Sequence, residues 1–306
     1  MTIVLAGGSG FLGRALNRQF SRAGHTVRIL SRRAAATADH VQWLPDGTSG
    51  PWAAALADAD VIVNLSGESL ADKRWTAARK EVIRNSRILP ARSIGRALAD
   101  VPARPRIVIT SSAIGYYGAH GEEPITEDAP PGADFLARLC VDWEVEAAAA
   151  ASSTTRVALV RSGLVLHPDG GALKPMLLPF RLGIGGRLGS GRQYWSWIHL
   201  DDWAGLVSWL AASTATITDA VSAWNATSPA AVTNATFSAI LARVLHRPAL
   251  IPVPEFALRA VLGEFAAFLT TGARVLPDRA ERSGFQFSHP TLEPALRDLL
   301  NPASRA

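Results

Sequence analysis

The stretch that decides the fold lies at the start of the chain and consists of Thr2-Ile3-Val4-Leu5-Ala6-Gly7-Gly8-Ser9-Gly10-Phe11-Leu12-Gly13. Its apolar run ends at a cluster of glycines, and apolar residues at helical spacing follow at once. This pattern predicts a strand, a tight turn and a helix. The glycines at positions 7, 10 and 13 are spaced G-x-x-G-x-x-G.

A separate role is predicted for each of these glycines. Gly7 permits the turn, Gly10 lets a phosphate group approach the backbone, and Gly13 lets the helix pack closely on the strand. The N–H groups of the first helical turn, which begins at Phe11 and Leu12, form an anion site together with the helix dipole. Since the flanking strand and helix are the context that the motif requires, we predict a dinucleotide-binding site. The alternative is a glycine-rich turn that binds nothing.

The end of the second strand indicates which dinucleotide binds. A strand is predicted at His25–Leu30, and it is followed by Ser31, Arg32 and Arg33 rather than by the acidic residue that holds the ribose 2′-hydroxyl in NAD sites. The guanidinium of Arg32 suits a 2′-phosphate because it is planar and permanently charged. We therefore predict that Ser31 and Arg32 contact NADP(H), in preference to NAD(H). The alternative is a solvated basic turn.

The composition is that of a globular protein with a large core. Of the 306 residues, 48% are hydrophobic and 19% are charged, and every apolar run is shorter than a membrane span. The net charge of +5 comes mostly from scattered arginines, so no nucleic-acid partner is predicted. Cys140 is the only cysteine, which excludes an internal disulfide. No basic region precedes the first apolar run, so we expect no signal peptide, no membrane partner and a cytoplasmic location.

Strands and helices alternate through the first half of the chain. Further strands are predicted at 41–43, 60–65, 105–110 and 156–161, and helices at 76–99, with a possible break at Pro90, and at 134–151. This alternation predicts an α/β fold with a doubly wound parallel sheet. Ligands of such sheets bind beyond the carboxyl ends of the strands. One crevice there would collect the residues that follow the strands, namely Gly10, Arg32, Ser66, Ser112 and Ser162.

Beyond residue 165 the pattern changes. Residues 166–198 are rich in Gly and Pro and are too many for an ordinary connection, which favours a substrate-side insertion. Helices are predicted near 233–246 and 291–300. The predicted first domain is therefore 1–165, completed by about 199–226, and a smaller C-terminal substrate-side domain consists of 166–198 and 227–306.

Several motifs resemble those of the extended short-chain dehydrogenase/reductases, the NAD(P)-dependent epimerase/dehydratase group, which has a Rossmann fold. Besides the glycine motif, they are Ser111-Ser112 and Trp197-Ile198-His199-Leu200-Asp201-Asp202. A closer resemblance is to an atypical subgroup, the epimerase family proteins with a C-terminal domain of unknown function. It rests on Asn64-Leu65-Ser66-Gly67-Glu68, Ser86-Arg87, Val160-Arg161-Ser162-Gly163, Gly170-Gly171-Ala172-Leu173 and Gly284-Phe285-Gln286-Phe287. The resemblance covers essentially the whole chain and implies fold and cofactor better than reaction.

The subgroup pattern also implies which residues contact NADP(H). They are Arg32, Leu65, Ser66, Glu68 and Arg87, with Ser162 and Gly163 near the nicotinamide. For Glu68 and Arg87 the alternative interpretation is an ion pair that ties a loop to a helix.

The chain departs from the family at the catalytic pair. Extended members carry Tyr-x-x-x-Lys at the start of the helix after the fifth strand, where the Lys lowers the pKa of the Tyr. Alignment on Glu144 puts Leu136 and Cys140 at these positions, and neither side chain can do this work. We predict instead that Tyr116 donates the proton, supported by Ser112. The alternative is that Tyr116 only packs in the crevice.

Four residues are predicted on the substrate side: Tyr117, Gln193, Trp195 and His199. Trp195 and Trp197 would face one side of a strand, where core packing is the alternative. His199 stands close to two aspartates in sequence, but a hydrogen-bond network that caps the next helix is favoured over a metal site. No metal is predicted.

The sequence thus predicts an NADP(H)-dependent oxidoreductase that transfers a hydride to or from an unidentified small carbonyl or hydroxyl compound. One alternative is a non-catalytic NADP(H)-responsive binding or regulatory protein, which the missing Tyr/Lys pair favours. Another is a nucleotide-sugar epimerase, which would need an acid/base pair that the sequence does not show. A small-molecule substrate and a possible homodimer complete the predicted partners.

Overall fold

Parallel strands form the central sheet of the computed structural model, which describes residues 1–33, 37, 39–101, 104–213, 217–249 and 251–300. In spatial order the strands are β12 (Val221–Ala226), β7 (Arg156–Ser162), β5 (Ile107–Ala113), β4 (Val61–Asn64), β1 (Thr2–Ala6), β2 (Thr26–Ser31) and β3 (His40–Gln42). Every neighbouring pair is parallel. The order grows outward from β1 in both directions, which confirms the predicted doubly wound α/β fold.

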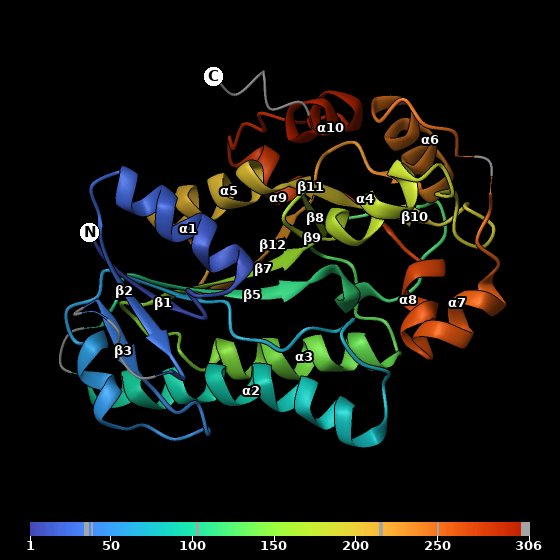
Figure 1. Cartoon of the computed structure of the whole chain (residues 1–306). Coiled ribbons are helices and arrows are strands. Elements are labelled where there is room, and N and C mark those ends of the chain that lie inside the picture. The colour runs from blue at the N-terminus through green and yellow to red at the C-terminus, as the bar shows by residue number, and fades with distance from the viewer. Residues whose placement is uncertain (34–36, 38, 102–103, 214–216, 250, 301–306) are drawn as a thin grey trace.

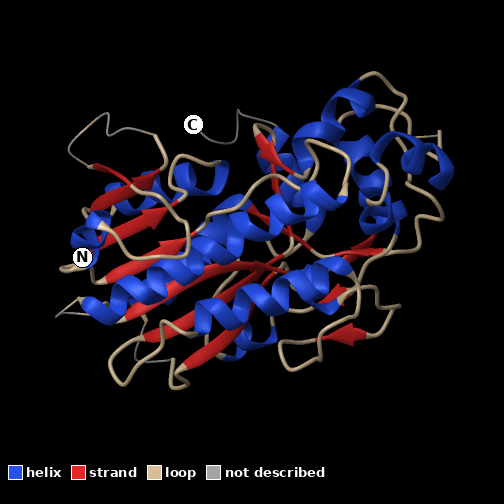
Figure 2. Ribbon diagram, turned by 90° about the horizontal axis from the view of Figure 1, so that it is seen from below, coloured by secondary structure: helices blue, strands red, loops and turns tan. Residues whose placement is uncertain are grey.

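Helices cover both faces of this sheet (Figure 1). On one face lie α1 (Phe11–Arg22), α5 (Leu200–Ala212) and the short α9 (Asp278–Arg282), and on the other lie α2 (Ala77–Asp100) and α3 (Phe135–Ala148). Side chains alternate along each strand, so Ile3 and Leu5 pack toward α1 and α5, whereas Val4 and Ala6 pack toward α2 and α3. Seen from below, the two long helices run along the strands and cover them (Figure 2). The helices therefore leave the carboxyl edge of the sheet as the place for ligands.

Helix α2 corrects one prediction. It runs without interruption through Pro90, where the sequence had left a break open. A proline in a helix removes one backbone hydrogen bond. Pro90 is buried against the same core as Ile88, Ala91 and Ile94, so packing of this long helix offsets the loss.

The rest of the chain builds a smaller unit beside the carboxyl edge of the sheet (Figure 1). Its strands are β6 (Pro124–Ile125), β8 (Leu164–His167), β9 (Gly170–Gly171), β10 (Tyr194–Trp195), β11 (Trp197–His199), β13 (Val232–Thr233) and β14 (Arg274–Val275). Its helices are α4 (Leu173–Arg181), α6 (Asn234–Val244), α7 (Glu255–Leu262), α8 (Phe265–Thr270) and α10 (Leu292–Leu300). The chain also has two short 3₁₀ helices: η1 (Pro51–Leu56) packs beside α2 and β3, and η2 (Ile114–Tyr117) directly follows β5.

This unit has a core of its own, in which Trp195, Trp197, Phe237 and Leu241 are buried. The two tryptophans lie in different strands, β10 and β11, so the single strand expected for them is not formed. Between the two parts of this unit the chain returns to the central sheet as β12. The domain boundaries stay a prediction.

No helix among the described residues combines the length and the apolar character that a membrane span needs.

Candidate functional site

The glycine turn after β1 has the geometry that a bound dinucleotide requires. Gly7 has a φ of +78°, and the Gly10 N–H donates to the Gly7 carbonyl at 3.0 Å. A Cβ atom on Gly13 would lie 2.5 Å from the Gly7 oxygen, so only glycine allows α1 to approach the turn this closely. Among the described residues no side chain caps the start of α1, which leaves the N–H groups of its first turn for an anion.

The loop after β4 forms the neighbouring wall of the crevice. The Leu65 N–H donates to the Ala6 carbonyl at 2.8 Å, and a Cβ on Gly7 would lie 3.0 Å from the Leu65 oxygen. Ser66 follows, and its N–H donates to Asn64 Oδ1 at 3.1 Å. Asn64 is fully buried, yet its Nδ2 has no partner among the described residues. Buried amide donors are rarely left without an acceptor, so this atom fits a crevice that holds a polar ligand.

Ser162 and Gly163 lie at the carboxyl end of β7, where they have packing contacts of their own. Ser162 Oγ accepts from Trp203 Nε1 at 2.9 Å. A Cβ on Gly163 would lie 2.4 Å from the Ser196 oxygen, so a side chain is excluded there. Their predicted contact with the nicotinamide stays a prediction.

Arg32 stands at the carboxyl end of β2, where the 2′-phosphate was predicted. Its side chain is 73% exposed, and Nη2 lies 3.3 Å from Glu68 Oε1. The carboxylate of Glu68 also lies 3.8 Å from Arg79 Nη1. Ser31 Oγ accepts from the Arg33 N–H at 3.1 Å and so fixes the turn. Arg32 is therefore held by a weak surface ion pair that a phosphate could replace.

Arg87 ties the Glu68 loop to α2, but not through the ion pair that the sequence suggested. Its Nη2 donates to the backbone carbonyl of Glu68 at 3.0 Å, and its Nη1 donates to the Ile83 carbonyl at 3.0 Å. Burial lowers the pKa of Arg87 from its ordinary value. Both Glu68 and Arg87 thus shape the crevice, and direct contact with the cofactor stays a prediction.

A buried polar network lies at the carboxyl ends of β5 and β7. Ser112 Oγ donates to Glu144 Oε1 at 2.6 Å, and Arg161 donates to both carboxylate oxygens of Glu144, at 2.9 and 2.8 Å. All three side chains are buried. Because the Ser112 hydroxyl is directed at a carboxylate, its geometry favours a structural role. This network was not predicted, although an arginine inside an apolar strand is a signal that a partner is buried with it.

Tyr116 and Tyr117 of η2 contact the same arginine. Arg161 Cζ lies 3.5 Å from the centroid of the Tyr116 ring. Tyr117 is fully buried, accepts from Arg161 Nη1 at 2.9 Å and donates to Asn225 Oδ1 at 2.7 Å. Burial raises the pKa of Tyr117 to about 12, so this phenol stays protonated at neutral pH. Tyr116 is half-buried and is not among the described residues that line the cavity.

Leu136 and Cys140 of α3 are the residues that the alignment on Glu144 predicts at the positions of the Tyr and Lys. Leu136 lines the cavity described next. Cys140 Sγ lies 3.7 Å from the Ala113 carbonyl, and burial raises the pKa of its thiol to about 12. An uncharged thiol cannot replace an ammonium group, so the usual means of lowering a phenol pKa is missing at this place.

A cavity of about 990 Å³ opens at the carboxyl end of β5. Its wall begins at Ile114 and Gly115, directly after the strand, and it includes Gly171. The neighbouring Gly170 packs on Phe11, because a Cβ there would lie 2.3 Å from the Phe11 ring. Since Phe11 is the first residue of α1, the cavity adjoins the glycine motif. The wall opposite residues 166–198 is contributed by α7 and α8, which lie in the second part, 227–306, of the predicted substrate-side domain.

The four residues predicted on the substrate side are not brought together. Trp195 lines the cavity, whereas Tyr117, Gln193 and His199 lie outside its described lining. Gln193 Nε2 instead donates to the carbonyls of Leu188 and Leu269, at 3.1 and 3.0 Å, and so joins two walls of the cavity. Their contact with substrate stays a prediction. Tyr194, which no motif singled out, contributes a phenol to the lining.

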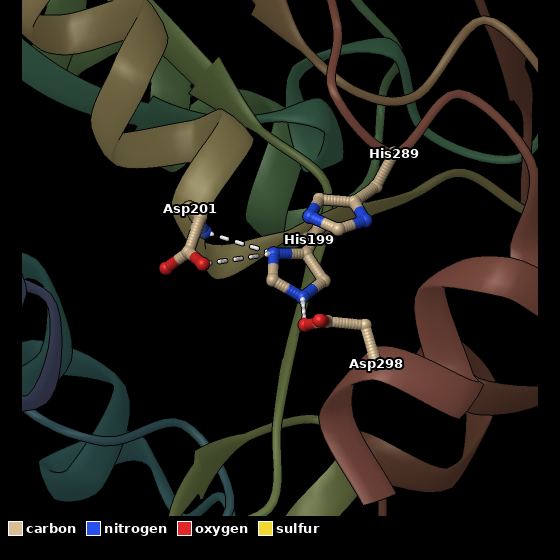
Figure 3. A group of neighbouring side chains, drawn as sticks. All are labelled: His199, Asp201, His289 and Asp298. Atoms are coloured by element: carbon tan, nitrogen blue, oxygen red, sulfur yellow. Dashed lines mark hydrogen bonds and ion pairs between the residues drawn. The ribbon is translucent and has the colours of Figure 1, made fainter. Parts of the chain in front are cut away.

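His199 belongs to a separate cluster that ties the C-terminal segment to α5 (Figure 3). Its Nδ1 accepts from the Asp201 N–H at 3.0 Å and thereby caps α5, as the sequence favoured. Its Nε2 lies 3.3 Å from Asp298 Oδ2, and its ring stacks on His289 with centroids 3.9 Å apart.

Four candidate metal ligands of this cluster lie within 4.8 Å of one another. However, a neutral imidazole that accepts at Nδ1 carries its proton on Nε2, and here that nitrogen faces Asp298. Neither nitrogen of His199 then offers a lone pair to a metal. The cluster is best described as a helix cap and an anchor for the C-terminal segment.

Comparison with known proteins identifies the family. Residues 3–222 match the NAD dependent epimerase/dehydratase family, and residues 253–299 match the domain of unknown function DUF1731. An epimerase family protein of Mycobacterium bovis is 42% identical over 296 residues, which cover 96% of each chain. The crystal structure of human epimerase family protein SDR39U1 with NADPH has a TM-score of 0.90 and 33% identity, and the match covers 98% of this chain and 99% of that chain.

A more distant structure, that of UDP-galactose 4-epimerase, is 19% identical with a TM-score of 0.72, over 100% of this chain and 99% of that chain, and shares the fold alone. The sequence motifs, the strand order of the sheet and these matches all indicate the same family. The chain therefore belongs to the NAD dependent epimerase/dehydratase family.

Proposed function

We propose that this chain is an NADP(H)-dependent oxidoreductase of the extended short-chain dehydrogenase/reductase type, acting on a small carbonyl or hydroxyl compound. The observation that carries the proposal is the position of the cavity of about 990 Å³, which starts directly after β5 and adjoins the glycine motif. A crevice for a dinucleotide and a cavity for a second molecule thus share one edge of the sheet. A related human protein was crystallised with NADPH, which supports the choice of cofactor.

The residues of the crevice fit this cofactor. Gly7, Gly10 and Gly13 would hold the pyrophosphate against the start of α1, and Arg32 would pair with the 2′-phosphate. Bound NADPH would supply a hydride for the carbonyl carbon of the substrate.

Reduction of a carbonyl also needs a proton for the oxygen atom. The Ser112 hydroxyl already donates to Glu144, and the Tyr117 hydroxyl already donates to Asn225. We therefore keep Tyr116 as the proposed proton donor. Tyr194 is the second candidate because its ring lines the cavity.

The test is NADPH consumption by the purified protein with a panel of aldehydes and ketones. Consumption that needs both protein and carbonyl compound is expected, and it should vanish in a Gly10→Val variant that still folds. A panel without any turnover, at protein concentrations where NADPH binding is saturated, would count against catalysis.

One observation favours a second function. Leu136 and Cys140 stand in place of the usual Tyr and Lys, and the Cys140 thiol is buried and uncharged. The rival proposal is a non-catalytic protein whose binding to a partner depends on NADP(H). Partner capture with and without NADPH, compared between wild type and Gly10→Val, separates the two. A cytoplasmic location and a homodimer also remain proposals, which fractionation and analytical ultracentrifugation would test.

A further inference from the structure

The cavity beside the cofactor crevice has walls made almost entirely of carbon. Large side chains line it from four parts of the chain: Trp75 before α2, Phe135 and Leu136 on α3, Met176 and Phe180 on α4, and Phe268 on α8. Its volume of about 990 Å³ is at the upper end of the range for small-molecule sites. Such walls favour an occupant whose surface is largely apolar, because transfer of apolar groups from water into an apolar site is favourable.

Three polar side chains of the lining, those of Ser196, Asp134 and Thr271, already have partners within the protein. Ser196 Oγ donates to the Ala273 carbonyl and accepts from the Val275 N–H, both at 2.8 Å. Asp134 accepts from the Ala137 N–H at 2.8 Å, as the cap of α3. Thr271 Oγ1 donates to the Ala267 carbonyl at 2.8 Å. A hydroxyl-rich ligand would have to break these bonds, so its own polar groups would be poorly matched.

Charges in the lining are also paired. Among the described lining residues Arg259 is the one cation, and its Nη2 lies 2.7 Å from Glu255 on the same helix, with the side chain 65% exposed. Glu264 forms an ion pair with Lys80. A diphosphate needs several cationic or N–H donors when it leaves water. The described walls do not offer such a set.

We propose that the substrate is an uncharged, predominantly apolar carbonyl compound and not a nucleotide sugar. This inference rests on the proposed oxidoreductase function. The carbonyl group lies at the Ile114–Gly115 end, next to the cofactor crevice, and the apolar body extends between α4 and the α7–α8 pair.

The experiment measures binding separately from turnover. The NADPH-saturated protein is titrated by calorimetry with three ketones, β-tetralone, benzophenone and a medium-chain methyl ketone, and with UDP-glucose. Met176→Asp puts a carboxylate into the cavity wall, and Leu178→Asp is the matched control on the same helix, because Leu178 is 66% exposed and is not part of the lining. Thermal unfolding and NADPH affinity of both variants verify that fold and cofactor site are intact.

We expect at least one ketone to bind, with affinity reduced at least about tenfold in Met176→Asp and unchanged in Leu178→Asp, and no saturable binding of UDP-glucose. Binding of UDP-glucose but of none of the ketones overturns the inference, and so does an equal loss in the two variants. If a ketone binds in this way but NADPH is never consumed, the apolar ligand class stands and the oxidoreductase proposal fails. If NADPH is consumed only with UDP-sugars, the oxidoreductase proposal stands and the proposed apolar ligand class is wrong.

Discussion

The two ends of the ligand site are built in different ways. The cofactor end consists of backbone at strand ends, and each of its parts is a short continuous stretch, such as Gly7–Gly13 or Leu65–Glu68. The cavity end consists of side chains that meet from distant places, such as Trp75 before α2, Met176 on α4 and Phe268 on α8. A dinucleotide crevice is therefore encoded locally, whereas the walls that select a substrate depend on the packing of the whole chain.

The largest effect is expected at the glycine turn of the cofactor end. Gly10→Val is expected to abolish NADPH binding while the fold survives, because the added Cβ meets only the Gly7 oxygen, at 3.2 Å, and otherwise fills the ligand's space. Gly13→Val should lose both binding and fold, since its Cβ would lie 2.5 Å from the backbone of Gly7 and Gly8. Fluorescence titration and thermal unfolding measure the two effects, with Gly121→Ala as a control in open space. Normal binding by Gly10→Val would refute the dinucleotide assignment.

The buried network between the two ends provides a test of stability. Glu144→Ala leaves the Arg161 guanidinium buried without its carboxylate, and we expect the free energy of unfolding to fall by about 3–5 kcal/mol. Glu146→Ala removes the partner of Arg92 at the surface of α3 and should cost no more than about 1 kcal/mol. Denaturant unfolding measures both. Equal losses in the two variants would mean that the network is not the support of the site that we describe.

The proton donor lies between the two ends of the site, and its replacement should affect turnover more than stability. Tyr116→Phe should keep fold and NADPH affinity but lower kcat by about 10²-fold, the usual size of a general-acid contribution. Tyr117→Phe should instead lower stability by about 1–3 kcal/mol, because Arg161 and Asn225 each lose a buried hydrogen-bond partner. Tyr194→Phe is the matched variant in the cavity wall. If the rate loss follows Tyr194 and not Tyr116, the proton comes from the cavity side.

The smallest expected effect concerns cofactor choice. Arg32→Ala should weaken NADPH binding by about ten- to a hundredfold, which corresponds to roughly 1.5–3 kcal/mol, and should leave NADH binding unchanged. Glu68→Gln removes the carboxylate that now pairs with Arg32, so NADPH binding should strengthen by up to about 1 kcal/mol. Titration of both cofactors decides this. Equal affinities of the wild type for NADPH and NADH would contradict the assignment.

Prediction from the sequence succeeded where local pattern sets the structure. The doubly wound parallel sheet, the turn at Gly7 and the basic residue after β2 follow from short-range spacing, and the structure has all three. The long-range contacts could not be derived in this way. Arg161 and Glu144 are 17 residues apart and lie in different elements, and no periodicity joins them. Pro90 shows the same limit, since burial of the whole of α2 decides that the helix continues.

The carboxylate of Glu127 bears on the time at which the site forms during synthesis on the ribosome. It accepts from the N–H groups of Asn225 and Arg279, which lie 98 and 152 residues further along the chain. Burial raises the pKa of Glu127, so removing this group from water is unfavourable until both donors have emerged. We therefore expect the nascent chain to expose the Glu127 loop to water after its first strands have formed. The cofactor crevice then precedes the substrate cavity in the order of assembly, and the C-terminal segment completes the site.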